Sequence, residues 1–158
     1  MIRILALLAG LVLGALPVLA QDEAEGGERN PVEISADNFT INEESQEGVF
    51  TGNVVVIHPS VTVRAPKVVI TYGEGGTSDI ESFEATGDVR LETPEQVATG
   101  ERAVFDPAAR TLHLTGNVEV TNPSGTVRGP ELLVDLNTGV STFTGSQSGR
   151  VTGTFTTE

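Results

Sequence analysis

Hydrophobic and polar residues alternate with a period of two along most of this chain. In the segment TLHLTGNVEV, residues 111–120, the leucines and valines point to one face, whereas His113, Asn117 and Glu119 point to the other. This period is typical of a half-buried β-strand. After residue 20 no segment carries the apolar stripe of an amphipathic helix, and Thr, Val and Gly are abundant. The pattern therefore predicts an all-β fold.

The same strand pattern occurs four times along the chain. A Thr-Gly motif, which three times continues as Asn/Asp-Val, begins at Thr51, Thr86, Thr115 and Thr144. A second marker, a small residue followed by Asp, Glu or Pro, begins at Ala36, Ala65, Gly100 and Gly129. Both markers advance by steps of 29 or 35 residues. We interpret this as four repeated two-strand units, which bury their apolar faces only by stacking, as in a flattened sandwich or a twisted β-jelly roll.

Turn-forming residues connect the two strands of each unit. They lie at 42–48, 73–77, 106–110 and 137–139. The glycine of each Thr-Gly motif has the parity of the inward side chains, so it permits a bend that redirects the strand. Proline lacks the ladder donor, and we therefore expect Ala65-Pro66 and Gly129-Pro130 to mark breaks between sheets or edge positions.

One face of the predicted strands is apolar in every unit, and it forms either a closed core or the lining of a lumen. The residues of this inner face are Ile34, Phe39, Ile41, Phe50, Val54, Val56, Val63, Val68, Ile70, Tyr72, Phe83, Val89, Leu91, Phe105, Leu112, Leu114, Val118, Val120, Leu132, Val134, Leu136 and Phe143. On the outer face, Val55, Ile57, Val69 and Leu133 break the alternation. Either a second layer covers them or they belong to a contact surface.

The N-terminus divides into two segments before the β domain. Residues 1–20 resemble a secretory signal peptide with cleavage after Ala20, although a retained membrane anchor is the alternative interpretation. Residues 21–31 are acidic and nearly free of apolar side chains, which predicts a flexible leader. Residues 32–158 then form a single domain. Without cysteine the chain has no disulfides and no lipid-modified N-terminus, so the core alone must stabilise it.

Charge and motifs argue against several classes of function. The formal net charge of −13 disfavours binding to nucleic acid or to an anionic membrane surface. His58 and His113 lie in different units without other metal ligands at suitable spacing. The sequence contains no nucleophile elbow and no phosphate-binding glycine loop. We therefore expect a protein that is not an enzyme and that has no metal and no cofactor.

The succession of motifs carries a family resemblance over essentially the whole β domain. The motifs are VEISADNFTIN (32–42), VFTGNVVV (49–56), VRAPKVVITY (63–72), FEATGDVRL (83–91) and VRGPELLVDLNTGVSTFTG (127–145). The chain resembles the LptA/OstA family of periplasmic lipopolysaccharide-transport proteins. One departure is that Ala65-Pro66 and Gly129-Pro130 stand where the family often has Ala-Asp or Gly-Asp.

The resemblance implies a β-jelly roll that is open at both ends and located in the periplasm. It implies that lipopolysaccharide is bound by its lipid A acyl chains, with the inner-face residues lining the lumen. The implied partners are other copies of the chain, joined head to tail through edge strands, an inner-membrane clamp protein (LptC-like) and an outer-membrane translocon (LptD-like). Arg64 and Arg128 are candidate phosphate contacts at the open seam; the alternative is that they pair with Glu or Asp on the outer face.

Two other functions remain open at this point. The first is a membrane-anchored inner-membrane clamp of the same pathway, which would retain the N-terminal segment. The second is a β-repeat adhesion or assembly module, whose apolar face would be a closed core without bound lipid.

Overall fold

The computed structural model describes residues 31–157. The predicted signal peptide, 1–20, and residues 21–30 of the acidic leader lie outside the described residues. The described residues form an all-β fold, as the period of two predicts, with one three-residue 3-10 turn, η1 (Gly76–Ser78). The strands are β1 (Glu33–Ser35), β2 (Asn38–Asn42), β3 (Glu47–His58), β4 (Val61–Tyr72), β5 (Ile80–Glu92), β6 (Val97–Asp106), β7 (Thr111–Asn122), β8 (Gly125–Asp135), β9 (Val140–Thr144) and β10 (Thr152–Phe155). Within this range, no helix has the length and apolar character needed to cross a bilayer.

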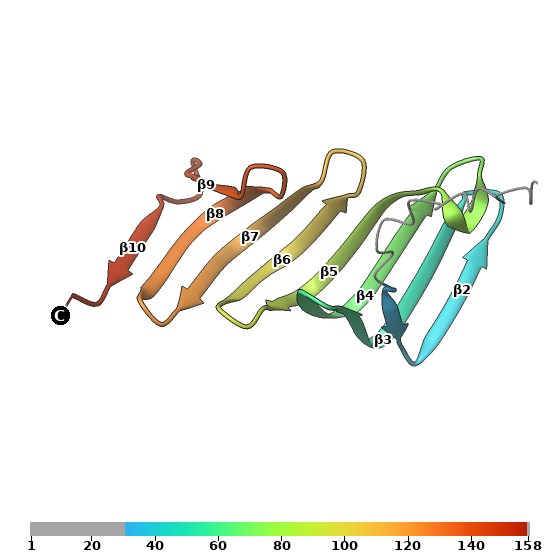
Figure 1. Ribbon diagram of the computed structural model, residues 1–158, viewed down its shortest axis with the longest axis horizontal. Coiled ribbons are helices and arrows are strands. Elements are labelled where there is room, and N and C mark those ends of the chain that lie inside the picture. Colours follow the sequence, from blue (N-terminus) through green and yellow to red (C-terminus); the bar gives the residue numbers. More distant parts are fainter. Residues whose placement is uncertain (1–30, 158) are drawn as a thin grey trace, which may run out of the picture.

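All the strands belong to one antiparallel sheet, in which the long strands β3 to β8 follow one another in sequence order. The order is β1-β3-β4-β5-β6-β7-β8-β10, with β2 also on β3 and β9 also on β8 (Figure 1). The four predicted turns connect β2 to β3, β4 to β5, β6 to β7 and β8 to β9. The four repeated units are therefore confirmed, and the two edges of the sheet each consist of two short strands.

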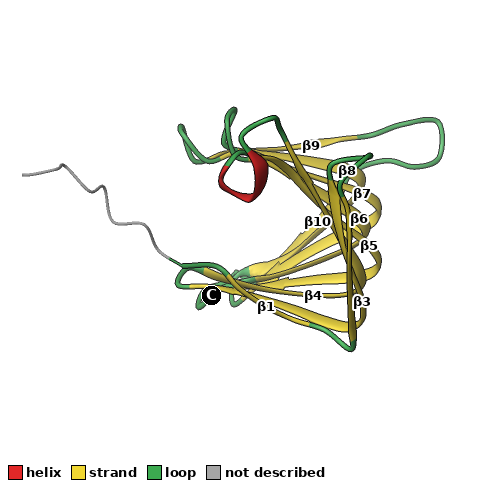
Figure 2. Cartoon of the chain, turned by 90° about the vertical axis from the view of Figure 1, so that its right-hand side faces the viewer, coloured by secondary structure: helices red, strands yellow, loops and turns green. Residues whose placement is uncertain are grey.

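The sheet is bent lengthwise into an open trough, and its bulges lie along the bend. The ladder shifts register between Thr51 and Val54 in β3, between Thr86 and Val89 in β5, and between Thr115 and Val118 in β7. Each shift spans the Gly-Asn or Gly-Asp pair of the repeated motif. Because a bulge bends its strand and increases the local twist, the aligned bulges fold the sheet into two facing walls. Figure 2, which looks along the row of strands, shows the resulting trough.

The glycine and asparagine of the motif satisfy the backbone geometry of the bulge. Gly116 has φ +80°, and Asn117 has φ 47°, a left-handed conformation that Asn tolerates better than most residues. Asn117 Nδ2 also donates a hydrogen bond of 2.6 Å to Glu101 Oε1 on the neighbouring strand. The same arrangement recurs where Asn53 Nδ2 donates to Asp37 Oδ2 at 2.9 Å.

The two prolines differ from the prediction, since they break no sheet and occupy no edge. β4 runs without interruption through Pro66, and β8 through Pro130. Each proline falls in a register gap of its neighbouring ladders, between Arg64 and Lys67 in one case and between Gly129 and Glu131 in the other. The missing N–H is therefore tolerated in the interior of the sheet, because the ladder is already interrupted there.

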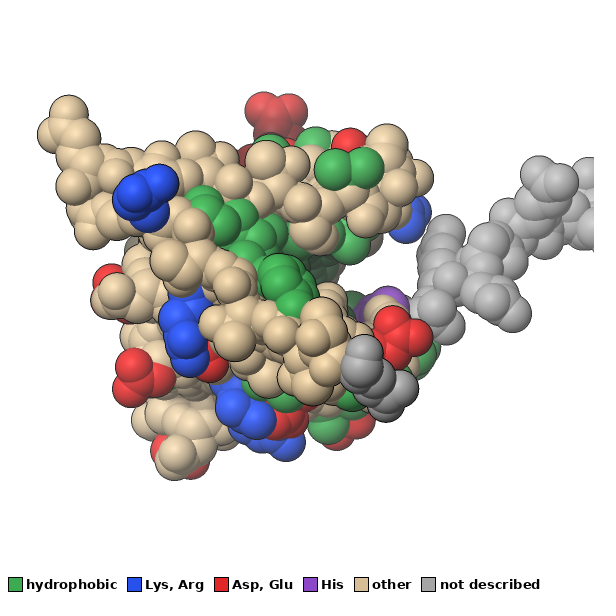
Figure 3. Space-filling model, turned by 90° about the vertical axis from the view of Figure 1, so that its left-hand side faces the viewer, with side chains coloured by type: hydrophobic (Ala, Val, Ile, Leu, Met, Phe, Trp, Pro, Cys, Tyr) green, Lys and Arg blue, Asp and Glu red, His purple; other side chains and the backbone are tan. Residues whose placement is uncertain are grey.

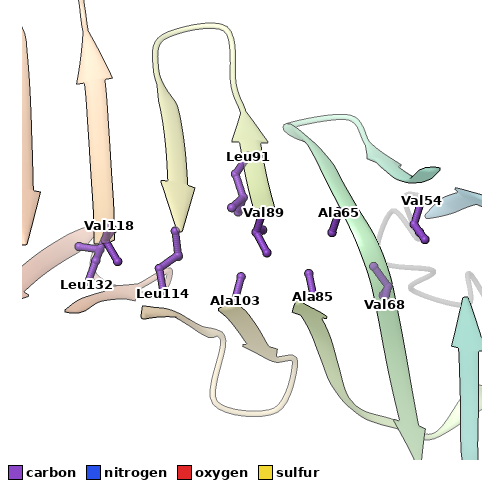
Figure 4. Packing of buried hydrophobic residues seen from close by; sticks show 10 residues of the cluster. All are labelled: Val54, Ala65, Val68, Ala85, Val89, Leu91, Ala103, Leu114, Val118 and Leu132. Atoms are coloured by element: carbon purple, nitrogen blue, oxygen red, sulfur yellow. The ribbon is translucent and has the colours of Figure 1, made fainter. Parts of the chain in front are cut away.

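A narrow hydrophobic core follows the bend. Leu114 is completely buried, and Val54, Val89 and Val118 are nearly so. Figure 4 shows these side chains together with Ala65, Val68, Leu91, Ala85, Ala103 and Leu132, contributed by successive strands along the sheet. No polar or charged residue of the described chain is buried. The core thus comprises the floor of the trough and the wall residues next to it, and it leaves the space between the walls open.

Candidate functional site

The space between the two walls is an apolar cavity of about 500 Å³. Seen from the C-terminal end, hydrophobic side chains gather inside the hollow, whereas Lys, Arg, Asp and Glu occupy the outside (Figure 3). Its lining contains no Asp, Glu, Lys or Arg. A single curved sheet with such an interior is an open trough and not the filled core of a closed β-repeat module.

The strand register arranges the lining in rows. Val68, Ala85, Ala103, Leu114 and Leu132 are successive partners across one wall. The adjacent row on the same wall contains Phe83 and Phe105, whose ring centroids lie 6.2 Å apart. On the opposite wall Val63, Leu91, Ala98 and Val120 pair in the same way. Because alanine side chains are short, Ala85, Ala103 and Ala98 in the centre of these rows leave the space between the walls unfilled.

Many of the inner-face residues predicted from the sequence line this cavity. They are Val56, Val63, Val68, Phe83, Leu91, Phe105, Leu112, Leu114, Val120, Leu132, Val134, Leu136 and Phe143.

The remaining inner-face residues do not line the cavity, and they lie in three different places. Val54, Val89 and Val118 form the buried floor beneath it, and Ile34 and Phe50 pack against that floor. Phe39 and Ile41 lie on the edge strand β2 and are 51% and 49% exposed. Ile70 and Tyr72 lie on β4 outside the lining. Parity identifies the face of a strand, but it does not show where along that face the trough begins.

The period of two also places Ala85 and Ala103 on the inner face, and both line the cavity. Some of the lining was missed by the sequence analysis. Val61 and Ala98 have the same inward parity, so the period of two could have identified them. His58, the last residue of β3, and Ser141 on β9 share the parity of Val56 and Phe143, but their polar side chains kept them out of an apolar pattern. Ser60, Thr93 and Gln96 lie in turns and Val32 precedes β1, so strand parity does not direct their side chains.

Arg64 and Arg128 point away from the cavity. Arg64 forms an ion pair with Glu92, and Arg128 forms one with Glu119. Arg90 Nε also lies 2.6 Å from Glu92 Oε1, and hydrogen bonds from Arg90 and then from Arg64 hold the pKa of Glu92 below its usual value of 4.5. The geometry of both arginines thus matches ion pairing on the outer face, which was the alternative to phosphate contacts at the open seam.

The apolar residues of the outer face are not covered by a second layer of the described chain, which forms a single sheet. Ile57 and Leu133 are 46% and 45% exposed, whereas Val55 and Val69 are half-buried by their neighbours in the sheet.

The two histidines lie in different environments. His113 Nε2 is 2.5 Å from Glu131 Oε1 on the outer face, and His58 Nδ1 is 2.7 Å from Ser60 Oγ at the mouth of the cavity. Among residues 31–157 no three His, Cys, Asp or Glu side chains come together as a metal site would require.

Comparison with known proteins identifies a family and a fold. Residues 33–140 match the family described as LptA/(LptD N-terminal domain) LPS transport protein. An uncharacterized protein of Rhizobium meliloti is 31% identical over 116 residues, 69% of this chain and 62% of that protein. The chain therefore spans less than two thirds of the length of that relative.

Two further similarities involve proteins with descriptive names. The lipopolysaccharide export system protein LptA of Haemophilus influenzae is 27% identical over 129 residues, which is 77% of this chain and 74% of that protein. The crystal structure of LptH, the LptA-homologous periplasmic component of the lipopolysaccharide transport device of Pseudomonas aeruginosa, superposes with a TM-score of 0.70. That comparison covers 81% of this chain and 96% of LptH at 16% identity, so it shows a shared fold.

Proposed function

Because the chain belongs to the LptA/LptD N-terminal-domain family of lipopolysaccharide-transport proteins, we propose that it carries lipopolysaccharide through the periplasm from the inner to the outer membrane. The lipid A acyl chains lie in the trough. The observation that carries this proposal is the apolar cavity of about 500 Å³, whose lining contains no Asp, Glu, Lys or Arg. The family is one of transport proteins, and the proposed role requires no catalysis.

Burial of acyl chains supplies enough free energy to hold the lipid without a covalent bond. Each buried methylene contributes about 0.8 kcal/mol, so one chain of about a dozen carbons gains on the order of 10 kcal/mol before ordering costs are subtracted. The trough is open along its length, so sugars and phosphates remain in water while the chains are buried. The direction of transport must come from an energy source outside this chain.

Edge strands offer a way to join copies into a continuous trough. β1 and β2 pair only with β3, and β9 and β10 pair only with β8, so both edges of the sheet retain unpaired backbone groups. β2 and β10 are exposed along their whole length. Such edges pair readily with another strand. We therefore include in the proposal head-to-tail association of copies, and the same mode of contact with an LptC-like clamp and an LptD-like translocon.

Filling the trough tests the proposal directly. Ala103 is buried and lines the cavity, whereas its neighbour Val104 lies on the outer face of the same strand. The substitution Ala103→Phe should place a ring in the acyl space and weaken binding of lipid A at least about tenfold, since each tenfold loss corresponds to only about 1.4 kcal/mol. Val104→Phe, which adds the same ring outside, should bind normally.

Displacement of a fluorescent acyl probe by lipid A measures both variants, and urea unfolding verifies that each is folded. Equal binding by Ala103→Phe and the unmodified protein would place the lipid outside the trough. Absence of lipid A binding by the unmodified protein would refute the carrier function itself.

A further inference from the structure

The polar side chains of the cavity lining are concentrated at the rim of one wall. The polar side chains of this rim are His58, the last residue of β3, Ser60, in the turn between β3 and β4, and Thr93 and Gln96, in the turn between β5 and β6. The opposite wall carries Phe83, Phe105, Leu112, Val134 and Leu136 over the same strands and their neighbours, and its polar lining residue is Ser141 on β9, the ladder partner of Val134. The two sides of the trough mouth therefore differ in chemistry.

The polar rim is one continuous row of the sheet. His58 is the ladder partner of Val61, and the pairing of Thr62 with Glu92 places Val61 beside Thr93. The N–H of Thr93 donates to the carbonyl oxygen of Gln96 at 2.9 Å. His58 and Gln96 thus lie at the two ends of a row three strand spacings wide, which is about 14 Å.

Hydrogen bonds within the turns leave His58 with a free donor. The backbone N–H of Ser60 donates to His58 Nδ1 at 3.2 Å, and Ser60 Oγ lies 2.7 Å from the same nitrogen. Since Nδ1 is the acceptor, the neutral imidazole carries its proton on Nε2. No residue of the described chain is hydrogen-bonded to that Nε2.

In the turn between β5 and β6, the side-chain amide of Gln96 is likewise available to donate a hydrogen bond. The hydroxyl of Thr93 is fully used, because it accepts hydrogen bonds from the N–H groups of Glu95 and Gln96 and donates one to the carbonyl oxygen of Gln96. The side-chain amide of Gln96 has no hydrogen-bond partner among residues 31–157. The His58 Nε2–H and the Gln96 amide therefore remain available on this rim, whereas the hydroxyls of Ser60 and Thr93 are bonded within the turns.

From this arrangement, and resting on the carrier function above, we propose that His58 and Gln96 form a polar subsite for the head end of a bound lipid. The His58 Nε2–H and the Gln96 amide donate hydrogen bonds to acceptor oxygens where the acyl chains join the headgroup. The chains then enter the trough from this rim and extend across the floor toward Phe83 and Phe105. The subsite orients the lipid, whereas the apolar rows supply the affinity.

Apolar replacements of similar shape test the two donors. His58→Phe and Gln96→Leu should each weaken binding of lipid A about tenfold, the effect of losing roughly one net hydrogen bond. His113→Phe is the matched control, because this histidine lies on the outer face, and it should bind lipid A as the unmodified protein does. The readout is displacement of a fluorescent acyl probe by lipid A.

Lipid A with and without its phosphates separates the two sources of acceptor oxygen. If only the phosphorylated lipid loses affinity in the variants, the donors contact phosphate; if both lipids lose affinity, the donors contact the carbonyl or hydroxyl oxygens of the acyl linkages. Either result supports the subsite. Unchanged binding of both lipids by His58→Phe and Gln96→Leu would overturn it.

A second measurement uses the unmodified protein and so does not depend on the folding of a variant. Stearic acid labelled with a nitroxide near its carboxylate should broaden the amide NMR signals of Val61 and Thr93, and the same acid labelled at its methyl end should broaden those of Phe83 and Phe105. The reverse pattern would overturn the orientation. If Ala103→Phe blocks lipid while the rim variants bind normally, the subsite fails and the carrier function stands.

Discussion

At the residue scale, Gly116 is subject to two constraints, as are Gly52 and Gly87 at the equivalent positions of the repeated motif. Its φ of +80° is left-handed, and an added Cβ would lie 2.5 Å from Glu101 Oε2 and 2.7 Å from Glu101 Cβ. Gly139, in the turn before β9, has a similar φ of +71° but nothing within 4 Å of the added carbon. The bulge therefore requires glycine for space as well as for conformation.

Substitution of both glycines separates these effects. Gly139→Ala should lower the free energy of unfolding by about 1 kcal/mol, the cost of a left-handed alanine. Gly116→Ala should cost roughly 1–3 kcal/mol more, because the methyl group also crowds Glu101. Urea unfolding of the two variants measures the difference. Equal losses would mean that the carboxylate of Glu101 moves aside freely.

At the scale of elements, ion pairs connect neighbouring strands on the outer face. Glu92 on β5 lies between Arg90 of its own strand and Arg64 of β4, and these two guanidinium groups lower its pKa. All three side chains are partly exposed, so solvent and salt screen the interaction. Its contribution to the β4–β5 pairing should therefore be small and depend on pH.

The direction of that pH dependence follows from the lowered pKa. A carboxyl group with a lower pKa in the folded than in the unfolded state stabilises the fold above its unfolded pKa, here near 4.5, and this stabilisation disappears as the pH falls through the folded value. We therefore expect Glu92→Gln to be less stable than the unmodified protein at pH 7 and to approach it in stability in acid.

Urea unfolding across the acid range, repeated at high salt, tests this expectation. Glu95→Gln is the control, because Glu95 forms no ion pair within the described chain, and its stability should follow that of the unmodified protein. A difference for Glu92→Gln that persists undiminished in acid would assign its effect to packing and not to charge.

At the scale of the whole molecule, the two short strands at each edge are the sites of the proposed association between copies. β10 forms its ladder with β8, and the N–H of Thr156 donates to the carbonyl oxygen of Ser124 at 3.0 Å. Since backbone groups alternate along a strand, Thr152 and Thr154 also face β8, whereas Gly153 and Phe155 present their N–H groups to the free edge. Phe155 is 66% exposed, so its side chain is open to a partner.

Proline at position 155 tests end-to-end association. Phe155→Pro removes an outward N–H without removing a donor from the β8–β10 ladder, and Phe155→Ala removes the same ring but retains the N–H. Sedimentation velocity over a range of concentrations should show fewer oligomers for the proline variant than for the alanine variant. If the two variants assemble alike, the edge at β10 is not the one that pairs.

The sequence by itself determined the elements and the face of most side chains. The period of two in TLHLTGNVEV, the repeated Thr-Gly motif and the turn residues all act within a few positions of each other, where strand geometry fixes which way a side chain points. For this reason Leu112, Leu114 and Val120 were assigned to the inner face without knowledge of their partners, and the family resemblance rested on the same local motifs.

Only the tertiary structure decided what depends on pairing between distant strands. Phe39 and Phe143 have the same inward parity, yet only Phe143 lines the cavity, because its neighbours in space and not its strand pattern place it inside the trough. Likewise Pro66 lies in an uninterrupted strand because β5 has its bulge opposite, and Arg64 contacts Glu92, 28 residues away. Register, bending and side-chain contacts are set by long-range packing, which a local pattern does not contain.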